Sequence, residues 1–511
     1  NRPELRETAD YTQESLFNTG YSVGELAKEL FPNGVEVEFD ADSFSGMIAK
    51  TKELIANGAE VIYEATFSED GIFSMADILV KNGDDWDMYE VKASTKVKEY
   101  HIDDAAIQWY ALSKTIKLNR VYIAHINNKY TRNILDAQTT LDIYRIFFLG
   151  KTFKMRKNNI SKYEIFKKYL EDGLDIERLF TIEDVTELVQ DKQYAIEPNL
   201  ADMEQVLKGD MPNIDIGGHC GDPFGCDFKE HCWKHIPTPS VFNLYWMNWS
   251  KKFEMYYKGM MTYADIPRDF RLNGTQKLQV ETSRTKEPYI NKEIIKKFLG
   301  TIEYPINFFD FETFQSAIPR FNNQRPYQQM PFQYSLHILH EDGTMEHKEF
   351  LGDENSDPRE DLIKQMLDDI TPTGSIIAYN QSFEMSRIKE LATFKESREE
   401  ELLSLNERFV DLIVPFRGRG YYHPDFNGSF SIKSVLPAMF PNDNELDYKR
   451  LGSIQNGGDA MDTFANLHLI KDKSKIDRIK KDLLAYCHLD TLAMVRIWEK
   501  LHEFLEIDAK K

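Results

Sequence analysis

Hydrophobic and polar positions alternate in four runs near the start of the chain, and this pattern predicts strands. The runs cover residues 59–67, 74–80, 87–93 and 120–126, and a helical pattern over 103–116 precedes the last of them. A period of two is typical of strands, and a period near 3.6 is typical of helices. A helix inserted between strands predicts an α/β unit with a mixed sheet.

A second α/β pattern begins near residue 301. Its predicted strands lie at 306–314, at 332–351 across the turn EDGT, and at 374–380, with an apolar run at 408–416; its predicted helices lie at 359–370, 382–394 and 474–505. Strands that alternate with helices again favour a mixed sheet covered by helices.

These patterns divide the chain into four segments. They are a first α/β domain at 1–145, a helical extension with clustered cysteines at 146–240, a connector at 241–300 and a second α/β domain at 301–511. A chain of 511 residues is too long for a single ordinary core. Hydrophobic residues make up 41% and aromatic residues 13%, which favours folded domains over a disordered chain.

Two carboxylates interrupt the aromatic strand NFFDFETFQS. Asp310 and Glu312 are two positions apart, so both side chains point to one face of the strand. Burying neighbouring like charges is costly unless an arginine, a shared proton or a divalent metal neutralises them. The strand therefore predicts a neutralising partner.

Further acids follow where predicted strands meet helices. Glu384 comes shortly after the strand that ends in AYN, and Asp490 lies on the last helix, four residues after Tyr486. Carboxylates converging from strands and helices favour a pair of Mg²⁺ or Mn²⁺ ions, because these hard cations prefer oxygen ligands. Two such ions about 4 Å apart clamp a phosphodiester, and Tyr486 would orient the attacking water.

The motifs DFE, N-x-x-F-E and Y-C-x-x-D resemble those of the DEDDy 3′-5′ exonucleases, an RNase H-like group that includes the proofreading domains of B-family DNA polymerases. The resemblance covers residues 301–508 and implies an RNase H-like exonuclease domain with a mixed sheet. It implies catalysis and metal binding by Asp310, Glu312, Glu384 and Asp490, with Tyr486 as a further catalytic residue. That family carries Asp in its second motif where this chain has Glu384, and Asp411 is a nearby alternative ligand.

The first domain has its own acidic pattern. Asp77 closes the run GIFSMAD, and Glu90 and Lys92 share a face of the next strand in MYEVKAS. An acid followed by Glu-x-Lys supplies two metal ligands and a cation that polarises the phosphate or helps to deprotonate water. Gln108 follows on the helix at 103–116.

This order resembles the RecB-like branch of the PD-(D/E)XK nucleases, which implies a restriction-endonuclease-like first domain. The resemblance implies catalytic roles for Asp77, Glu90, Lys92 and Gln108, and metal binding by Asp77, Glu90 and, on an early helix, Glu25. Glu64 in YEATF is either an exposed strand charge or a hydrogen-bonding group near the metal.

Cys220, Cys226 and Cys232 crowd into HCGDPFGCDFKEHC, which indicates metal or cluster ligation in a reducing compartment. Their spacing is wider than the C-x-x-C pairs of a zinc ribbon. RecB-like nucleases often hold an iron-sulfur cluster with one cysteine before the nuclease core and three after it. The resemblance implies that these three cysteines are the latter group.

A 4Fe-4S cluster needs a fourth ligand, and the chain has no cysteine before Cys220. The alternatives are a cysteine upstream of Asn1, because the chain begins without a methionine, or a histidine ligand from His219 or His231. Zn²⁺ in place of a cluster, or no metal at all, stays open as well. Cys487 is predicted to be a core residue.

A net charge of −21 argues against coating nucleic acid by bulk electrostatics but leaves room for local basic grooves. We expect Asn380, Arg417 and Arg419 to contact nucleic acid and the aromatic side chains of Trp109, Tyr421 and Tyr422 to stack on a strand. A surface loop without such a role is the alternative for PFRGRGYYH. No apolar run is long enough to span a bilayer, which predicts a cytoplasmic protein without a membrane partner.

The combined motifs resemble a bacterial family that joins a RecB-like, cysteine-bearing nuclease to an RNase H-like exonuclease. We therefore expect a metal-dependent nuclease with two sites that acts on DNA, with single-stranded ends as the best substrate and RNA left open, in DNA repair or antiphage defence. Two alternatives belong to other classes. One is a nucleic-acid-binding scaffold whose Glu384-bearing site has decayed, and the other is a subunit of a larger repair or antiphage complex whose acidic surface faces protein partners.

Overall fold

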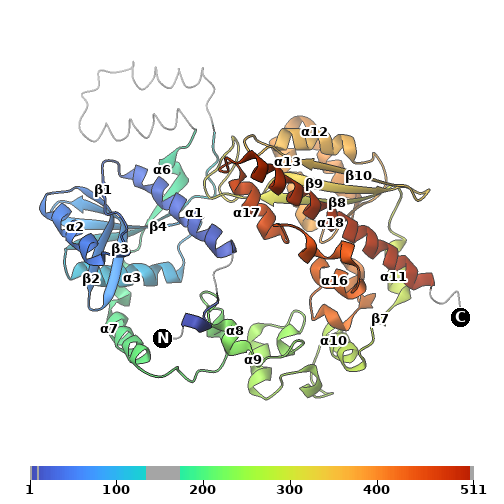
Figure 1. Cartoon of the computed structure of the whole chain (residues 1–511), viewed down its shortest axis with the longest axis horizontal. Helices are drawn as coiled ribbons and strands as arrows, with labels where there is room; N and C mark the ends of the chain where they lie inside the picture. Colours follow the sequence, from blue (N-terminus) through green and yellow to red (C-terminus); the bar gives the residue numbers. More distant parts are fainter. Residues whose placement is uncertain (1–2, 8–10, 134–172, 507–511) are drawn as a thin grey trace. The chain divides into compact units, whose positions relative to one another are not determined.

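The computed structural model describes residues 3–7, 11–133 and 173–506. They form two compact units, drawn in Figure 1. The first consists of Gln13–Ile214 with Ser316–Gln328, and the second consists of Asp215–Gln315 and Gln329–Lys511 with Arg2–Thr12. Residues 146–172 of the predicted extension at 146–240 lie outside the described residues.

The first unit is built on a six-stranded sheet with the order β1-β2-β3-β4-β5-β6. The strands are β1 (Val35–Glu36), β2 (Val61–Glu69), β3 (Ile72–Asn82), β4 (Asp85–Lys92), β5 (Leu118–Ile126) and β6 (Phe180–Asp184). The β2, β3 and β4 strands are antiparallel neighbours, whereas β4 and β5 are parallel. The four predicted strands, the intervening helix α3 (Glu99–Ser113) and the mixed sheet are therefore confirmed.

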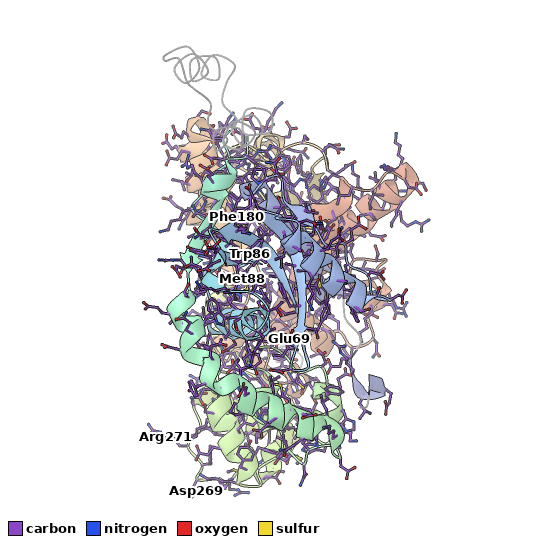
Figure 2. The ribbon with its side chains drawn as sticks, turned by 90° about the vertical axis from the view of Figure 1, so that its left-hand side faces the viewer. Glu69, Trp86, Met88, Phe180, Asp269 and Arg271 are labelled. Atoms are coloured by element: carbon purple, nitrogen blue, oxygen red, sulfur yellow. The ribbon has the colours of Figure 1, made fainter. Side chains whose placement is uncertain are left out.

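Alternation along β4 decides which residues meet α3. Trp86 and Met88 are buried in one core cluster with residues of α2 (Phe44–Ala56), α3 and α7 (Thr186–Lys208), and Figure 2 labels both on the sheet. Tyr89 and Val91 point the other way, toward a cluster that includes residues of α1 (Tyr11–Ala27). Because the period is two, Glu90 and Lys92 share the face of Met88 and point toward α3.

The segment Ser316–Gln328 is part of the core of the first unit, although about 100 residues separate it in sequence from the rest of that unit. Ala317 is buried in the cluster beneath α1, with Ile318 and Tyr327 packed against it. The hydroxyl of Tyr327 donates a hydrogen bond to the carbonyl of Ala93, one residue after the end of β4.

The second unit contains a five-stranded sheet with the order β10-β9-β8-β11-β12. The strands are β8 (Ile306–Phe314), β9 (Met330–Leu339), β10 (Met345–Leu351), β11 (Ile376–Ala378) and β12 (Phe409–Asp411). The central strand β8 is antiparallel to β9 and parallel to β11, so this sheet is also mixed, as predicted. The predicted strand across EDGT is the hairpin β9–β10, and the apolar run at 408–416 becomes β12 followed by the short helix α15 (Val414–Arg417).

The two faces of β8 are covered by different helices. Phe309 and Phe311 pack in a core cluster with residues of α12 (Arg359–Asp369) and α13 (Ser382–Phe394). Phe308 contacts Trp498 of α18 (Lys473–Glu506), and Phe314 contacts Phe464 of α17 (Gly457–Leu467). Asp310 and Glu312 lie between Phe308 and Phe314 on this second face, which places them beneath α17 and α18.

The connector is helical over part of its length. It contains α9 (Trp249–Tyr257), α10 (Gly274–Thr285) and α11 (Lys292–Leu299), while α8 (Lys229–Trp233) precedes it among the cysteines. A short sheet pairs β7 (Tyr289–Ile290) with β13 (Tyr421–Tyr422). Within the described ranges, every helix is too short or too polar to cross a membrane.

Candidate active site

The acids predicted from the second α/β pattern lie together in the second unit. Asp310 and Glu312 come from β8, Glu384 from the first turn of α13 and Asp490 from the middle of α18. Glu312, Glu384 and Asp490 are buried, with 7%, 3% and 8% of their surface exposed, whereas Asp310 is partly accessible. The structure thus joins side chains separated by up to 180 positions, from Asp310 to Asp490.

Burial raises the pKa of every acid in this group, and the charges of neighbouring acids raise it further at Asp310, Glu312 and Glu384. Burial, followed by the charges of Asp490, Glu384 and Glu312, holds the pKa of Asp310 well above its ordinary range. Burial raises the pKa of Glu384 to about 8 and that of Asp490 to about 6. These shifts mean that the group resists full ionisation without a cation.

Glu384 has an oxygen that lacks a protein partner. Its Oε2 is buried and accepts no hydrogen bond from any of the described residues. The alternative ligand, Asp411, already uses Oδ1 to accept hydrogen bonds from the backbone N–H groups of Asn380 and Ile413, at 2.8 and 3.1 Å. An orphaned buried carboxylate oxygen is the donor type that Mg²⁺ and Mn²⁺ require, so the residues fit such an ion.

Two tyrosines hold Asp490. Tyr448 donates its hydroxyl to Asp490 Oδ1, and the hydroxyl of Tyr486 also bonds this carboxyl group. Burial and then the negative charge of Asp490 raise the pKa of the Tyr486 phenol, which therefore stays protonated. Gly457, the first residue of α17, lies next to the acids. A Cβ at this position would lie 3.9 Å from Glu312 Oε2 and 4.0 Å from the Tyr486 hydroxyl.

Lys433 brings a positive charge that sequence reasoning missed. Its Nζ lies 5.5 Å from the ring centres of both Tyr448 and Tyr486, and its charge lowers the pKa values of Glu312 and Asp490. The stretch SFSIKSVL that contains Lys433 matches no motif, so only tertiary packing reveals it.

Cys487 borders the site from α18. Its Sγ donates to the backbone carbonyl oxygen of Asp310 at 3.9 Å, and ligand atoms of Asp310, Glu312 and Cys487 all lie within 4.8 Å of one another. Burial raises the pKa of this thiol well above its usual value. The side chain is buried, as expected of a core residue, and its protonated thiol lies next to the acids.

The acidic pattern of the first domain also comes together. Lys92 Nζ contacts Glu90 Oε1 at 2.8 Å, and Gln108 donates from Nε2 to Glu90 Oε2 at 2.8 Å. Lys92 also pairs with Asp104, a residue of α3 that sequence reasoning missed although it lies one helical turn before Gln108. Asp77 Oδ2 accepts a hydrogen bond from the backbone N–H of Val91 at 2.6 Å.

Burial governs the charges of this second group as well. Burial raises the pKa of Asp77 to about 7, and the charge of Glu64 adds to this rise. Burial, followed by the charge of Asp77, raises the pKa of Glu90 to about 8. Unlike Glu384, Glu90 has protein partners on both oxygens. The acids of this site are therefore weaker evidence for a bound cation than the acids of the second unit.

Glu25 and Glu64 occupy different places. Glu25 on α1 forms an ion pair with Lys28 at 2.5 Å and does not contact Asp77 or Glu90 in the described structure. Glu64 lies across from Asp77, within the register that pairs Tyr63 with Ile78 and Ala65 with Ala76. Burial raises the pKa of Glu64 to about 7, with further increases from Glu36, Glu90 and Glu25, so Glu64 is not an exposed strand charge.

The cysteines of the extension are free thiols. Cys220 is buried, whereas Cys226 and Cys232 are exposed. Within the described part of the chain, their sulfur atoms do not form a trio in which all separations are 4.8 Å or less. A tetrahedral zinc site would need sulfurs about 3.8 Å apart, so this geometry does not present a formed zinc site.

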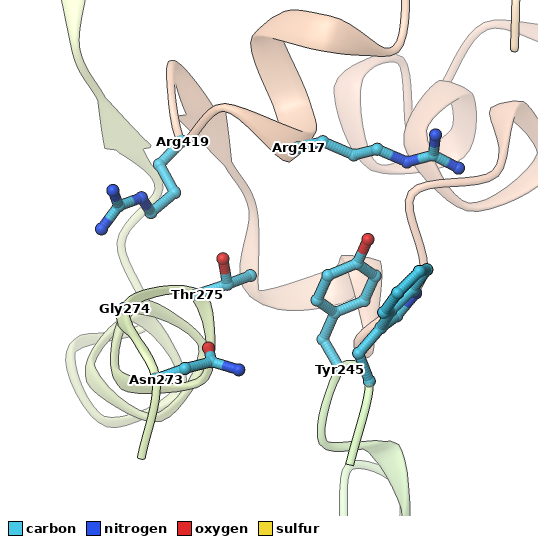
Figure 3. A pocket seen from close by; sticks show the side chains of 7 residues that line it. Tyr245, Asn273, Gly274, Thr275, Arg417 and Arg419 are labelled. Atoms are coloured by element: carbon cyan, nitrogen blue, oxygen red, sulfur yellow. The ribbon is translucent and has the colours of Figure 1, made fainter. Parts of the chain in front are cut away.

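The predicted nucleic-acid contacts line pockets of the second unit (Figure 3). A pocket of about 520 Å³ is lined by Tyr245, Trp246, Asn273, Gly274, Thr275, Arg417 and Arg419. An adjacent pocket of about 640 Å³ shares Tyr245, Trp246 and Arg417 and extends to Asn380. Arg417 donates to the Asn380 side chain at 3.5 Å, so both lie at the edge of the motif that carries Glu384.

A third pocket adjoins the second and is lined in part by Lys433. This pocket of about 550 Å³ shares Asn243, Asn427 and Ser429 with the second. Trp246 is 84% exposed, which offers an aromatic surface that sequence reasoning missed. Aromatic and basic side chains thus line these pockets from Arg419 to Lys433, whose charge acts on Glu312 and Asp490.

The stacking prediction for two aromatics is wrong. Tyr421 and Tyr422 are buried, with 4% and 1% of their surface exposed, because β13 packs against the core of the second unit. Tyr421 stacks on Phe504 of α18, with ring centres 4.8 Å apart. Trp109 is partly exposed where it packs against the core cluster of the first unit, so its stacking role stays a prediction.

A family model matches the region around the second sheet. Residues 307–431 match a family described as a domain of unknown function, DUF2779. Uncharacterized proteins of Ureaplasma parvum serovar 3 and Mycoplasma genitalium are 33% and 27% identical over 211 and 208 residues. Each match covers 37% of this chain, but only 30% and 31% of the respective relative, so the chain spans less than a third of their length. No solved structure matches the chain at a significant level.

Proposed function

We propose that this protein is a metal-dependent nuclease with two sites that hydrolyses DNA phosphodiesters, preferentially at single-stranded ends. The second unit would be a 3′-5′ exonuclease of RNase H-like fold, and the first would be a RecB-like PD-(D/E)XK nuclease. The observation that carries the proposal is the convergence of Asp310, Glu312, Glu384 and Asp490, with Glu384 Oε2 buried and unpartnered among the described residues. Acids buried in this way are destabilising unless a cation balances them.

Mg²⁺ or Mn²⁺ held by these acids would supply positive charge to a phosphodiester and lower the pKa of a water. The remaining residues have roles that follow from their contacts. The protonated hydroxyl of Tyr486, held by Asp490, can orient a water beside Glu312. Lys433 offers a cation to a phosphate oxygen.

The pockets between Arg419 and Lys433 support a path for a single strand. Exposed aromatics stack on bases of any sequence, and arginines attract the phosphate backbone. Trp246 and Arg417 supply these two features at adjacent positions of the same pockets. This local arrangement accommodates nucleic acid despite the acidic net charge of the chain.

The contact among Glu90, Lys92 and Gln108 supports the second active site in the first unit. Lys92 can stabilise negative charge on a phosphate, and Glu90 and Asp77 offer carboxylates to a cation. Because these acids already have protein partners, the evidence for a metal site is stronger in the second unit.

The experiment is hydrolysis of a single-stranded oligonucleotide labelled at its 5′ end, with the full chain and Mn²⁺. The wild-type protein should shorten the strand stepwise from the 3′ end, and Asp310→Asn should slow this shortening by about 100-fold or more. Glu341→Gln, which removes an exposed acid from the EDGT turn, is the matched control. Equal shortening by Asp310→Asn would refute the assignment, and binding without cleavage by the wild-type protein would favour the scaffold alternative. DNA and RNA oligonucleotides of one sequence establish the substrate preference.

A further inference from the structure

Three histidines meet on the face of the second sheet that α18 covers. His337 lies on β9, His347 on β10 and His488 on α18. One ring nitrogen of each lies within 4.8 Å of those of the other two, and the ring centres are 4.3 to 4.8 Å apart. None of the three belongs to the acidic group of the proposed nuclease.

The hairpin explains how two of the histidines come together. His337 and His347 are directly paired across β9 and β10, so their side chains point to one face. This is the face of Asp310, because β9 pairs Ser335 with Asp310 and Ser335 is two residues from His337. His488 enters from α18, between Tyr486 and Asp490.

Hydrogen bonds orient the buried ring of His337. Its Nδ1 lies 2.8 Å from Oγ1 of Thr491, and this hydroxyl donates to the carbonyl of His488 at 3.1 Å. Thr491 Oγ1 also lies 2.7 Å from Ser335 Oγ, which lies 3.0 Å from His347 Nε2. In the arrangement in which Thr491 accepts from Nδ1–H, the lone pair of His337 is on Nε2. Histidine ligands of metals are usually held by such a hydrogen bond from the other ring nitrogen.

One ring nitrogen of His347 and one of His488 lie as far apart as two ligands of a single ion. His488 Nδ1 and His347 Nε2 are 3.2 Å apart. Two nitrogens bound tetrahedrally to Zn²⁺ lie about 3.3 Å apart, given Zn–N distances of about 2.0–2.1 Å.

We infer that His337, His347 and His488 form a binding site for Zn²⁺ that joins α18 to the β9–β10 hairpin. His347 is exposed, which gives an ion a route from solvent and leaves a fourth position for water. The site is separate from the Mg²⁺ or Mn²⁺ positions proposed above, since it offers imidazole nitrogens instead of carboxylates. Its role is to fix α18, which carries Tyr486 and Asp490 on either side of His488.

The test is the zinc stoichiometry of the full chain, stripped of metal with a chelator and then titrated with Zn²⁺. The wild-type protein should bind one equivalent more than His347→Ala and His488→Ala. His340→Ala removes a histidine of the same hairpin that pairs with Glu346, and it should keep the equivalent. Asp310→Asn and Cys226→Ser should keep it too, which separates this site from the acids and the clustered cysteines.

A second readout covers variants that fold poorly. Zn²⁺ should raise the thermal unfolding temperature of the wild-type protein but not that of His347→Gln, a mild change at an exposed position. Co²⁺ in the site should give the absorption of a four-coordinate ion with nitrogen ligands and no thiolate band. Equal stoichiometry in the wild type, His347→Ala and His488→Ala would overturn the inference, whether or not the protein proves to be a nuclease.

Discussion

Glu384 reaches the acidic group from the first turn of α13, and its longer side chain is the feature that departs from the exonuclease motif. Its Oε2 is buried without a partner among the described residues, whereas Asp411 is committed to backbone N–H groups. We therefore expect Glu384→Gln to reduce Mn²⁺-dependent cleavage by about 100-fold or more. Asp411→Asn preserves the Oδ1 acceptor and should change the rate by less than about threefold, within the range expected of a structural cap. The reverse order of effects would identify Asp411 as the ligand.

The pKa of Glu384 also predicts how stability depends on pH. A carboxyl group with a pKa raised from 4.5 to about 8 binds more protons in the folded than in the unfolded state, so its contribution to stability falls as pH rises through this window. The lowered pKa values of His337 and His347 make stability rise with pH instead, but this effect is confined to pH values below their ordinary pKa of 6.5. Between pH 6.5 and 8, the metal-free protein should lose thermal stability, and Glu384→Gln should lose less. The measurement is the melting temperature of both proteins in chelator at several pH values in this range. An equal fall of the melting temperature with pH in the wild type and Glu384→Gln would contradict the raised pKa of Glu384.

Some site residues could be predicted from the sequence because short-range spacing determines them. Alternation places Asp310 with Glu312 and Glu90 with Lys92, and helical spacing places Tyr486 with Asp490. The hairpin turn EDGT also carries a signal, because it sets the register that places His337 opposite His347. Lys433 and Tyr448 carry no such signal, because only long-range packing brings them to Asp490.

At the scale of elements, the position of β8 depends on a close approach by the turn before β11. Gly374 has a φ of +84°, and a Cβ there would lie 2.0 Å from the carbonyl oxygen of Pro305, the residue before β8. Gly374→Ala should therefore displace β8 and lower the free energy of unfolding by more than the approximately 1 kcal/mol expected for a left-handed residue alone.

A second glycine separates the cost of the left-handed backbone conformation from the cost of the contact with Pro305. Gly343, in the β9–β10 turn, has a φ of +85°, but a Cβ there would meet no atom within 4 Å. Gly343→Ala should then carry only the conformational penalty, measured by chemical denaturation. Equal losses at both positions would show that the contact with Pro305 is unimportant.

The elements themselves were largely predictable, whereas their order in the sheets was not. Periodicity indicated β2 to β5, β8 to β11 and the long helix α18. The order β10-β9-β8-β11-β12 depends on pairing between distant strands, and no local signal specifies it. Tyr421 and Tyr422 show the same limit, because their burial results from contacts with remote segments such as Phe504.

At the scale of the whole molecule, the first unit depends on Ser316–Gln328 from the second half of the chain. Tyr327 packs against the core beneath α1 and bonds the carbonyl of Ala93, next to Lys92. Tyr327→Ala should destabilise the first unit by about 2–4 kcal/mol, whereas Tyr327→Phe should cost about 1 kcal/mol by removing only the hydrogen bond. Hydrogen exchange would locate the loss: faster exchange should appear in β4, and unchanged protection there would contradict this account.

The central claim is that two separate acidic sites hydrolyse nucleic acid, and one set of four proteins tests it most directly. The wild type, Asp310→Asn, Glu90→Gln and the double variant are incubated with single-stranded DNA and Mn²⁺, and the products are separated by length. The account predicts that Asp310→Asn loses stepwise shortening from the 3′ end, that Glu90→Gln retains it, and that the double variant binds DNA without cleaving it. Cleavage by the double variant at the wild-type rate would contradict the account.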